Sequence, residues 1–592
     1  MAPKAKAPAK PAQKSTVNGV KGAKITKSQP AAKQSKAAAA SKASTKTKPA
    51  TKATASKPVP KAASKAAAKS KAAPAPKTKA AAAKGVQNKN QNGKRAMDED
   101  GDAVHSSAEE AERRPQKKAR RSATPQPQGP TGWRKEVLKK RFYDEVINNP
   151  VPTSVLDVFV FGEGSSGELG LGSKKTGGKK PIDVKRPRLN PNLGPDVGIV
   201  DIACGGMHAI ALTKANRVLT WGVNDDKALG RDTTWAGGVR DADAEESDSD
   251  DDDDTGVNPR ESTPAYIDNG ELDPSDVICK VVACDSASFV LTTDGLVFGW
   301  GTFRGADGII GFSNDIKVQP TPMLIEPLRD ITNITCGSNH VIALDAWGKA
   351  WTWGSGGQFQ LGRKPLTRHG NTLVPQPCGL FTKRHRAVDI AAGSYHSFYV
   401  DNQQRVWSWG LNNYSQTGHH DATGEDDAMI LRPKVVDSLT DADISMIDGG
   451  EHHSVATTND GKLLTWGRVD GHQVGQPKDL YTEENAMFDE NNKPRILLKP
   501  TRATEMDAKI VAAGVDTSFA IDSTGHVYSW GFSANYQTGQ GTIEDIEVPT
   551  LIDNSAIRDR KIVWAGAGGQ FSILAAERDP ANNSTNSPEA KK

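Results

Sequence analysis

The sequence predicts an all-β protein: a seven-bladed β-propeller closed by N- and C-terminal strands in one blade and preceded by a long disordered basic tail. Three observations predict it: a recurring aromatic-glycine pair, an alternating apolar hairpin before each pair, and a half repeat at each end of the repeated region. The seven pairs are Phe161-Gly162, Trp221-Gly222, Trp300-Gly301, Trp353-Gly354, Trp409-Gly410, Trp466-Gly467 and Trp530-Gly531.

Each aromatic residue ends a hairpin of two strands. Segments such as HAIALTKANRVLTWG and TSFAIDSTGHVYSWG alternate apolar and polar residues around a central turn, as antiparallel strands do. Six of the pairs have a second glycine eight positions after the first, whereas the third pair has it ten positions later, at Gly311. Four short strands per unit, repeated seven times, match the blades of a propeller.

The two ends of the repeated region complement each other. The first repeat opens directly at VFVFG, and the missing half repeat, IVWAGAGGQFSILAA, occurs at Ile562 to Ala576. We expect Val158 to Phe161 to share a blade with Ile573 to Ala575, because such pairing removes the exposed edges of a linear array. The expected boundaries are a tail over 1–150, a propeller over 151–577 with an acidic disordered loop at 241–256, and a short disordered tail over 578–592.

The charge of the chain is divided unevenly. Residues 1–97 contain 24 Lys and Arg and no acid, so they cannot build a core. The remainder has 52 basic against 71 acidic residues, and Asp241 to Asp254 contains ten acids. The tail resembles linker-histone tails and would bind DNA phosphates without reading sequence. The alternatives are a solvated spacer for the tail and, for the acidic run, a disordered loop or a competitor of DNA for that tail.

Two shorter motifs follow the tail. A dense basic cluster, RRPQKKARR, indicates a nuclear import signal read by an import receptor. Its residues are Arg113, Arg114, Lys117, Lys118, Arg120 and Arg121. The segment WRKEVLKKRFYDEV has helical spacing of Trp133, Val137 and Phe142, and is a candidate for docking on the propeller.

Several classes of protein are disfavoured. The five cysteines are odd in number and lack C-x-x-C spacing, which argues against a disulfide scaffold or a zinc site. No apolar run has the length of a membrane span and no secretory signal is evident, so we expect a soluble intracellular protein. The cysteines are Cys204, Cys279, Cys284, Cys336 and Cys378.

Equivalent positions in several repeats carry histidine, which raises the question of a metal site. We expect His208, His340 and His396 to be structural, because rotational symmetry repeats structural contacts, and for His453, which follows His452, a structural and a functional role both stay open. The Gly162-x-Gly164-x-x-Gly167 spacing is not followed by a helix, so it does not predict a nucleotide site. No hydrolytic set stands apart from the repeat. We therefore expect no cofactor and no metal.

The motifs VFGEGSSGELGLG, CGGMHAIAL and WGVNDDKALGRDTT, with WGTFRGADGIIGF in the third blade, resemble the regulator of chromosome condensation family, of fungal or other eukaryotic type. The TFRGADGIIG string is similar to its chromatin-bound exchange-factor branch. The resemblance implies a nuclear, chromatin-associated guanine-nucleotide exchange factor for the GTPase Ran. Such a protein catalyses GDP release without bond chemistry and supports nucleocytoplasmic transport and spindle assembly.

The resemblance also implies functional residues. Positions that affect exchange map onto Asp285, Asn339 and His453. A β-wedge that inserts against the GTPase maps onto Phe312, Ser313, Asn314, Asp315, Ile316, Lys317 and Val318. A basic loop that meets DNA phosphates, next to a region that meets the histone dimer of the nucleosome, maps onto Arg363, Lys364, Arg368, Lys383, Arg384 and Arg386. The charge-only alternative for these basic residues is a solvated loop.

Position 339 departs from the family pattern, which has Asp there. Asn keeps the size of the side chain but removes a charge that could contact the GTPase. This departure and the acidic insertion favour an alternative function, a non-catalytic chromatin-binding scaffold.

Overall fold

The computed structural model describes residues 147–236, 255–364, 372–379, 381–382 and 384–578 of the 592-residue chain. The expected basic tail with its import signal, the acidic run, Arg368, Lys383 and the end of the chain beyond Arg578 lie outside the described residues. Within the described ranges, no helix is long and apolar enough to cross a membrane.

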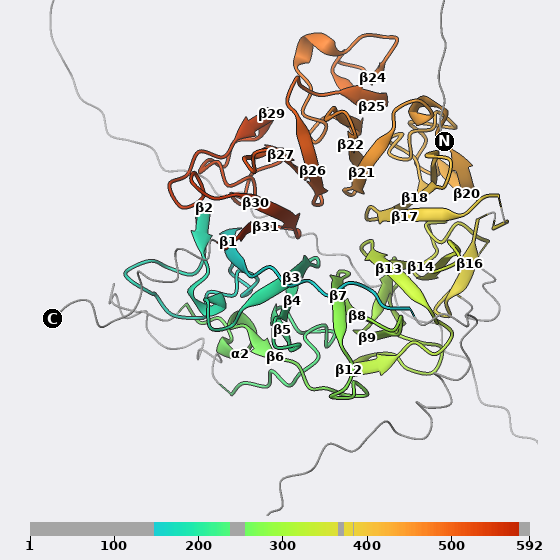
Figure 1. Cartoon of the computed structure of the whole chain (residues 1–592). Coiled ribbons are helices and arrows are strands. Elements are labelled where there is room, and N and C mark those ends of the chain that lie inside the picture. The colour runs from blue at the N-terminus through green and yellow to red at the C-terminus, as the bar shows by residue number, and fades with distance from the viewer. Residues whose placement is uncertain (1–146, 237–254, 365–371, 380, 383, 579–592) are drawn as a thin grey trace, which may run out of the picture. The chain divides into compact units, whose positions relative to one another are not determined.

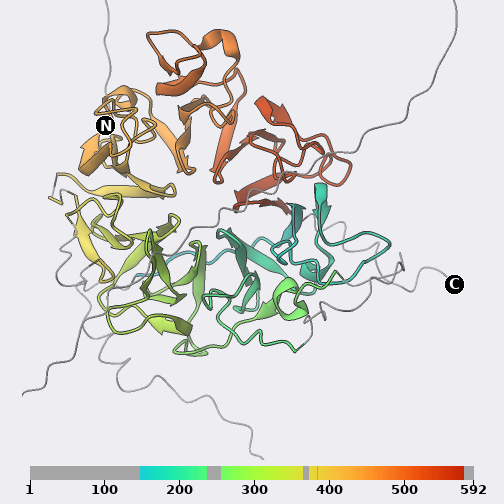
Figure 2. The ribbon, with the colours of Figure 1, turned by 180° about the vertical axis from the view of Figure 1, so that it is seen from behind.

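Seven antiparallel sheets follow one another around a central channel (Figure 1, and from behind in Figure 2). We number the blades by their aromatic-glycine pair. In spatial order, blade 1 contains β2 (Val184–Leu189), β1 (Leu156–Gly162), β31 (Phe571–Glu577) and β30 (Ile562–Ala567). Blade 2 contains β3 (Ile199–Cys204), β4 (His208–Thr213), β5 (Val218–Gly222) and β6 (Ala265–Tyr266). Blade 3 contains β7 (Ile278–Ala283), β8 (Ala287–Thr292), β9 (Val297–Gly301) and β12 (Gln319–Leu324).

The remaining four blades follow the same order. Blade 4 contains β13 (Ile331–Cys336), β14 (His340–Asp345), β15 (Ala350–Gly354) and β16 (Gln376–Cys378). Blade 5 contains β17 (Ala387–Ala392), β18 (His396–Asp401), β19 (Val406–Leu411) and β20 (Met429–Val435). Blade 6 has a fifth strand: β21 (Ile444–Gly449), β22 (His453–Thr458), β23 (Leu463–Arg468), β25 (Pro494–Arg502) and β24 (Ala486–Phe488). Blade 7 contains β26 (Ala508–Ala513), β27 (Thr517–Asp522), β28 (Val527–Gly531) and β29 (Ile546–Leu551).

Short elements occupy the connections. A separate hairpin, β10 (Phe303–Gly305) and β11 (Gly308–Gly311), lies between β9 and β12. One helical turn, α2, spans Pro259–Ser262. The 3-10 turns are η1 (Pro191–Leu193), η2 (Asp437–Leu439) and η3 (Lys478–Leu480).

The meander of each blade defines two faces of the ring. The turns between the first and second strands and between the third and fourth strands lie on one face, which we call face 1. The turns between the second and third strands and the connections between blades lie on the opposite face, face 2. Counted outward from the channel, the first strand of each blade, which is β30 in blade 1, lines the channel, whose volume is about 410 Å³.

Ring closure occurs as the sequence predicts. In blade 1, Val158 pairs with Ala575 and Val160 pairs with Ile573, which confirms the shared blade. The buried carboxylate of Asp157 reinforces the closure, because Arg560 Nη1 donates to one of its oxygens at 2.8 Å and Arg578 Nε to the other at 2.6 Å. These two arginines come from the C-terminal part of the chain, so the ion pairs tie the two ends together.

Neighbouring blades are joined by a repeated set of buried hydrogen bonds, which we call the interblade joint. Between blades 5 and 6, His396 Nε2 lies 2.8 Å from Ser454 Oγ. The Ser454 hydroxyl and the Trp466 indole N–H both donate to the Gln416 carbonyl at 2.8 Å. The other joints with histidine contain His208 with Ser288, His340 with Ser397 and His453 with Ser518. The four histidines are thus structural contacts.

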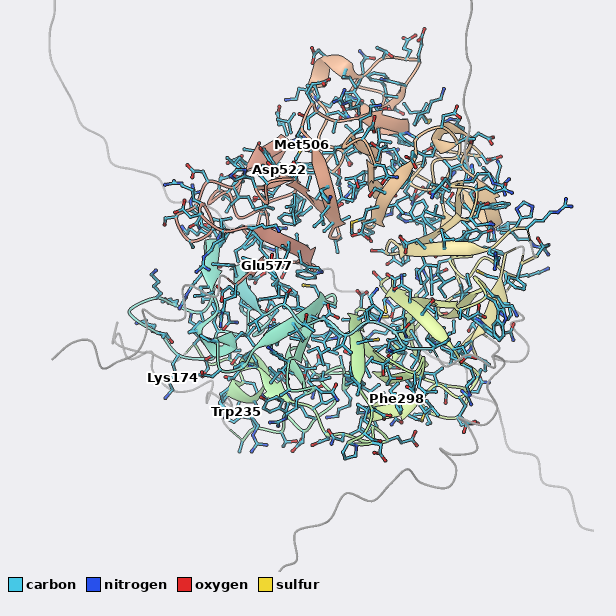
Figure 3. The ribbon with its side chains drawn as sticks, in the orientation of Figure 1. Lys174, Trp235, Phe298, Met506, Asp522 and Glu577 are labelled. Atoms are coloured by element: carbon cyan, nitrogen blue, oxygen red, sulfur yellow. The ribbon has the colours of Figure 1, made fainter. Side chains whose placement is uncertain are left out.

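In six of the seven repeats, the second glycine contacts the aromatic residue of the next blade; Gly311 is the exception. Gly475 has a φ of +61°, and a Cβ at this position would lie 2.6 Å from Cδ1 of Trp530. Only glycine fits there, because both the backbone conformation and the space exclude a side chain. Side chains fill the spaces between blades in the same way around the ring (Figure 3), and Phe298 on β9 is fully buried.

Candidate partner-binding faces

Face 1 has a pocket beside the mouth of the channel. Its volume is about 390 Å³, and turns from all seven blades contribute to it. Four carboxylates line it, and Arg304 is the cation among its lining residues, so its charge is negative. The carboxylates belong to Asp225, Asp226, Asp285 and Glu451.

Asn339 is hydrogen-bonded to Asp285, which lines this pocket. Asn339 Nδ2 donates to Asp285 Oδ2 at 3.2 Å, and Asn339 Oδ1 accepts the backbone N–H of Arg304 at 2.8 Å. The guanidinium of Arg304 pairs with the carboxylate of Asp226. This network fixes the turns of blades 2, 3 and 4 relative to the start of β10. The amide of Asn339 has a structural role here, since a carboxylate at position 339 could not donate to Asp285.

The electrostatics of Asp285 favour a basic partner. Displacement of water by the surrounding rim raises the pKa of its carboxyl, and Glu451 adds to the rise. Hydrogen bonds from Ser338 and Asn339 oppose the rise by stabilising the carboxylate. The side chain remains exposed, so water reaching its oxygens limits the effect of the rim. A cation from a partner would stabilise this carboxylate further.

The segment expected to form the wedge, Phe312 to Val318, contains no strand. Phe312 is buried and stacks on Phe289 and Phe303, with ring centroids 6.3 Å apart in both pairs. The two-stranded element is the hairpin β10–β11, which comes just before this segment and carries the 40 % exposed Ile309. The expected position of the β-element is therefore corrected to 303–311, and 312–318 is the loop that returns to β12.

His453 is at the end of β22 nearest face 1, but its side chain is not on the surface. The ring is fully buried and its Nε2 lies 2.7 Å from Ser518 Oγ. Burial lowers the pKa of His453 to about 3, so the ring stays neutral at physiological pH. Its effect on a partner could come only through the turn that it anchors, which contains Glu451 and His452.

Face 1 also has a cluster of cations around one aromatic ring, which sequence reasoning missed. The guanidinium carbons of Arg468 and Arg495 each lie 5.4 Å from the centroid of the Tyr414 ring. The His452 ring packs edge-on against Tyr414 with centroids 4.9 Å apart. Tyr414 lies in the loop after β19 and His452 in the turn before β22, while Arg468 ends β23 and Arg495 lies at the start of β25, so only the fold brings them together.

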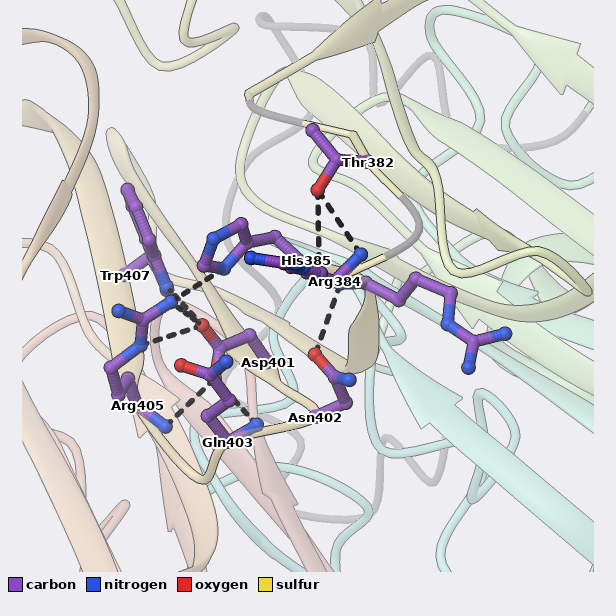
Figure 4. A network of polar contacts seen from close by, with 9 residues as sticks. Thr382, Arg384, His385, Asp401, Asn402, Gln403, Arg405 and Trp407 are labelled. Carbon is purple, nitrogen blue, oxygen red and sulfur yellow. Dashed lines mark hydrogen bonds and ion pairs between the residues drawn. The ribbon is translucent and has the colours of Figure 1, made fainter.

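The basic residues of the connection between blades 4 and 5 lie on face 2. Arg384 and Arg386 are exposed, and the turn that carries them is fixed by its backbone. The N–H groups of Arg384 and His385 both donate to Thr382 Oγ1, at 3.2 and 3.1 Å, and that of Arg386 donates to Asn402 Oδ1 at 3.2 Å (Figure 4). The backbone bonds leave the two guanidinium groups available to a partner.

A second layer beneath these arginines is internally neutralised. Arg405 donates twice to Asp401 Oδ2, at 2.9 and 2.7 Å, and lies 2.8 Å from Nδ1 of His385. Trp407 Nε1 donates to the same carboxylate at 2.9 Å (Figure 4). Because Asp401 accepts all these bonds, the pKa of its carboxyl is lowered despite the opposing effect of burial. The layer holds the turn in place and contributes little net charge.

The expected basic loop is not one patch. Arg363 and Lys364 follow β15 and so lie on face 1, opposite Arg384 and Arg386. Arg363 is also partly buried, and its Nη2 donates to the carbonyls of Thr352 and Val374 at 3.2 and 3.4 Å. Burial lowers the pKa of its guanidinium. The expectation of a single basic loop is corrected, because the chain between Lys364 and Arg384 passes from one end of the four-stranded sheet to the other.

Within the described ranges, no group of three or more His, Cys, Asp or Glu is arranged to hold a metal ion. The ring histidines in particular use their Nε2 atoms on serine hydroxyls. The arrangement of both faces is that of surfaces for macromolecular partners.

Comparison with known proteins agrees with this architecture. The sequence pattern of the RCC1-like domain matches residues 157–574. The guanine nucleotide exchange factor SRM1 of Saccharomyces cerevisiae is 41 % identical over 71 % of this chain and 86 % of its own length.

Two solved structures are similar over the propeller. The crystal structure of Prp20p from Saccharomyces cerevisiae, described with its binding properties to Gsp1p and histones, has a TM-score of 0.64 and 37 % identity and covers 74 % of this chain and 94 % of its own. Yeast RCC1 (Prp20) bound to Kap60 has a TM-score of 0.65 and 36 % identity and covers 75 % of this chain and 96 % of its own. The chain therefore belongs to the RCC1-like domain family, that of the regulators of chromosome condensation.

Proposed function

We propose that this protein is a guanine-nucleotide exchange factor for a GTPase of the Ran type, held on chromatin in the nucleus. The observation that carries the proposal is the acidic pocket on face 1, with the exposed hairpin β10–β11 at its edge. The similarity to SRM1, which extends over most of both chains, supports the same function.

The propeller would act by binding one conformation of the GTPase better than another. The carboxylates of face 1 attract basic residues of the partner, while the hairpin presents Ile309 as an apolar contact. A partner held in the conformation that lacks nucleotide loses its bound GDP faster, because binding energy stabilises the open state. The abundant GTP then takes its place. No covalent bond changes, so no nucleophile or general base is required.

Rigidity of face 1 is part of this mechanism. Hydrogen bonds between backbone groups of successive blades surround the mouth of the channel, for example from Asp285 N to Ser338 O at 2.8 Å and from Ser394 N to Gly450 O at 3.0 Å. A surface fixed in this way can distort a partner without being distorted itself, so that the binding energy is used on the GTPase.

Face 2 and the basic tail are the proposed chromatin contacts. Arg384 and Arg386 are exposed there, on the side opposite Asp285. Cations on this face and in residues 1–97 would bind DNA phosphates without base specificity, next to a contact with the histone dimer. Prp20p, described with histone binding, and yeast RCC1 bound to Kap60 support a nucleosome and an import receptor as partners.

The test is the rate of release of fluorescent GDP from Ran with substoichiometric amounts of the full chain. We expect the rate of GDP release to rise many-fold, and GTP then to bind in place of the released GDP. The alternative is a non-catalytic chromatin scaffold, which was suggested by Asn339. It predicts nucleosome binding with no change in the rate of GDP release, so the same assay, run beside a nucleosome-binding assay, separates the two functions.

A further inference from the structure

The joint between blades 3 and 4 lacks both the histidine-serine pair and the glycine contact, whereas the joint between blades 1 and 2, with Phe571 and Ala209, lacks the pair but keeps the glycine contact. Blade 3 has Ala287 where the standard joint has histidine, and blade 4 has Val341 where it has serine. The second glycine is displaced by the hairpin: Gly311 faces Leu373, and no glycine packs on Trp353. Among the described residues, the indole N–H of Trp353 has no hydrogen bond to a carbonyl of blade 3, unlike the corresponding bond of Trp466.

A groove opens at this irregular joint. Its volume is about 450 Å³, and its apolar lining includes Phe312, Met323, Trp353 and Leu373. The carboxylates of Glu271 and Glu326 also line it, and no cation does. One oxygen of Glu271 accepts the backbone N–H of Leu324 at 2.9 Å, which fixes this side chain at the edge of the groove. The groove therefore suits an apolar side chain next to positive charge.

The start of the described chain leads to this joint. Asn149 is buried, and its Nδ2 donates to the carbonyls of Thr292 in blade 3 and Ile331 in blade 4, at 3.1 and 2.8 Å. Ile331 lies four residues after Pro327, which lines the groove. Asn149 is therefore anchored on the two blades that border the groove. The seven residues back to Phe142 span at most about 24 Å when extended, which is enough to reach it.

The sequence of the preceding segment complements the groove. Residues 133–142 read WRKEVLKKRF, with five Lys and Arg, one Glu, and the aromatic residues Trp133 and Phe142. An aromatic side chain can fill the space beside Trp353, and the flanking cations can face the carboxylate of Glu326.

We propose that the groove between blades 3 and 4 binds residues 133–146 of the same chain, with Phe142 beside Trp353. Docking would complete the one joint that lacks both its histidine-serine pair and its glycine contact. It would also bring residues 133–146 close to Phe312, which packs beneath the hairpin β10–β11. The segment that connects to DNA would then support the surface proposed for the GTPase. This consequence rests on the proposed function, whereas the docking itself does not.

Photo-cross-linking in the full chain tests the docking. A photoreactive phenylalanine analogue, p-benzoylphenylalanine, replaces Phe142, and in the matched control it replaces Thr131. We expect cross-links from position 142 to peptides that contain Phe312, Met323 or Leu373, and none to these peptides from position 131. Cross-links to other blades, or no cross-links, would overturn the proposal. A mixture of isotopically light and heavy chains identifies cross-links between two copies, which would also overturn it.

A second measurement uses hydrogen exchange of the full chain. Phe142→Asp should increase amide exchange at residues 323–328 and 372–378, and Glu326→Arg should do the same, because each removes one side of the contact. Leu431→Asp, at a residue of blade 5 that is 54 % exposed, is the control and should leave these peptides unchanged. Unchanged exchange in both groove peptides of Phe142→Asp would contradict the docking even if GDP release is accelerated normally.

Discussion

Substitution of Gly475 by alanine tests the contact that sets the eight-residue spacing of the repeats. The new Cβ would lie 2.6 Å from Cδ1 and 2.7 Å from Nε1 of Trp530, and 3.0 Å from Cδ of Pro549. The indole cannot move away without loss of its hydrogen bond to the Gln473 carbonyl, which measures 2.8 Å. The left-handed backbone, with φ of +61°, adds a second cost for any residue with a Cβ.

The magnitude follows from these two costs. A non-glycine residue in the left-handed region costs about 1–2 kcal/mol, and overpacking of a filled core costs about 1–3 kcal/mol. We therefore expect Gly475→Ala to lower the free energy of unfolding by about 2–5 kcal/mol. Guanidinium denaturation, followed by tryptophan fluorescence and circular dichroism, measures this change as a shift of the midpoint at constant slope.

Substitutions of two other glycines measure the backbone cost and the packing cost separately. Gly177 has a φ of +59° with nothing within 4 Å of an added Cβ, so Gly177→Ala should cost only the backbone component, about 1–2 kcal/mol. Gly357 also has open space and lacks the positive φ, so Gly357→Ala should change stability by less than about 1 kcal/mol. If Gly475→Ala destabilises no more than Gly177→Ala does, the packing of glycine on tryptophan does not limit the sequence at this position.

Three further predictions concern the two faces and the histidines. Asp285→Ala should slow Ran-GDP release with the fold intact, whereas Asp441→Ala, at an exposed residue on face 2, should not; equal rates for both would reject the face 1 assignment. Arg384→Ala with Arg386→Ala should weaken nucleosome binding and reduce the salt dependence of log K by about two, one per phosphate contact, while GDP release is unchanged. Burial lowers the pKa of His453 to about 3, below the value near 6.5 of the unfolded chain, so its contribution to stability is present above pH 6.5 and is lost as pH falls towards 3. Between pH 6.5 and pH 3, the free energy of unfolding of His453→Gln should therefore fall less steeply with decreasing pH than that of the unsubstituted protein, by about 1.4 kcal/mol per pH unit. Unfolding midpoints measured against pH give this slope, and an unchanged slope would show that the ring is protonated in the folded protein.

The sequence predicted those parts of the molecule that obey the repeat. The pairing of β1 with β31 and the structural use of the ring histidines follow from positions that recur with fixed spacing. The buried state of His453 could have been inferred in the same way, since it occupies the position of His208 and His396.

The sequence was least informative where the repeat is interrupted. The two extra residues before Gly311 form a hairpin of their own, so positions counted from the repeat fell beyond its strands. The basic residues from Arg363 to Arg386 appear continuous in sequence, yet β16 carries the chain from one face to the other between them. The group of Tyr414, Arg468 and Arg495 comes from a loop of blade 5 and two strands of blade 6, and the spacing of the repeat does not indicate that they meet.

The interblade joints also limit how this chain can vary over evolutionary time. Each joint histidine faces a serine of the following blade in all four cases, whereas both partners are absent between blades 3 and 4, with Ala287 and Val341, and between blades 1 and 2, with Phe571 and Ala209. Loss of one partner leaves a buried polar group without its bond, which costs more than loss of both. Substitutions at the two positions should therefore be inherited in pairs, and a blade transplanted between relatives should be accepted only together with the matching residue of its neighbour.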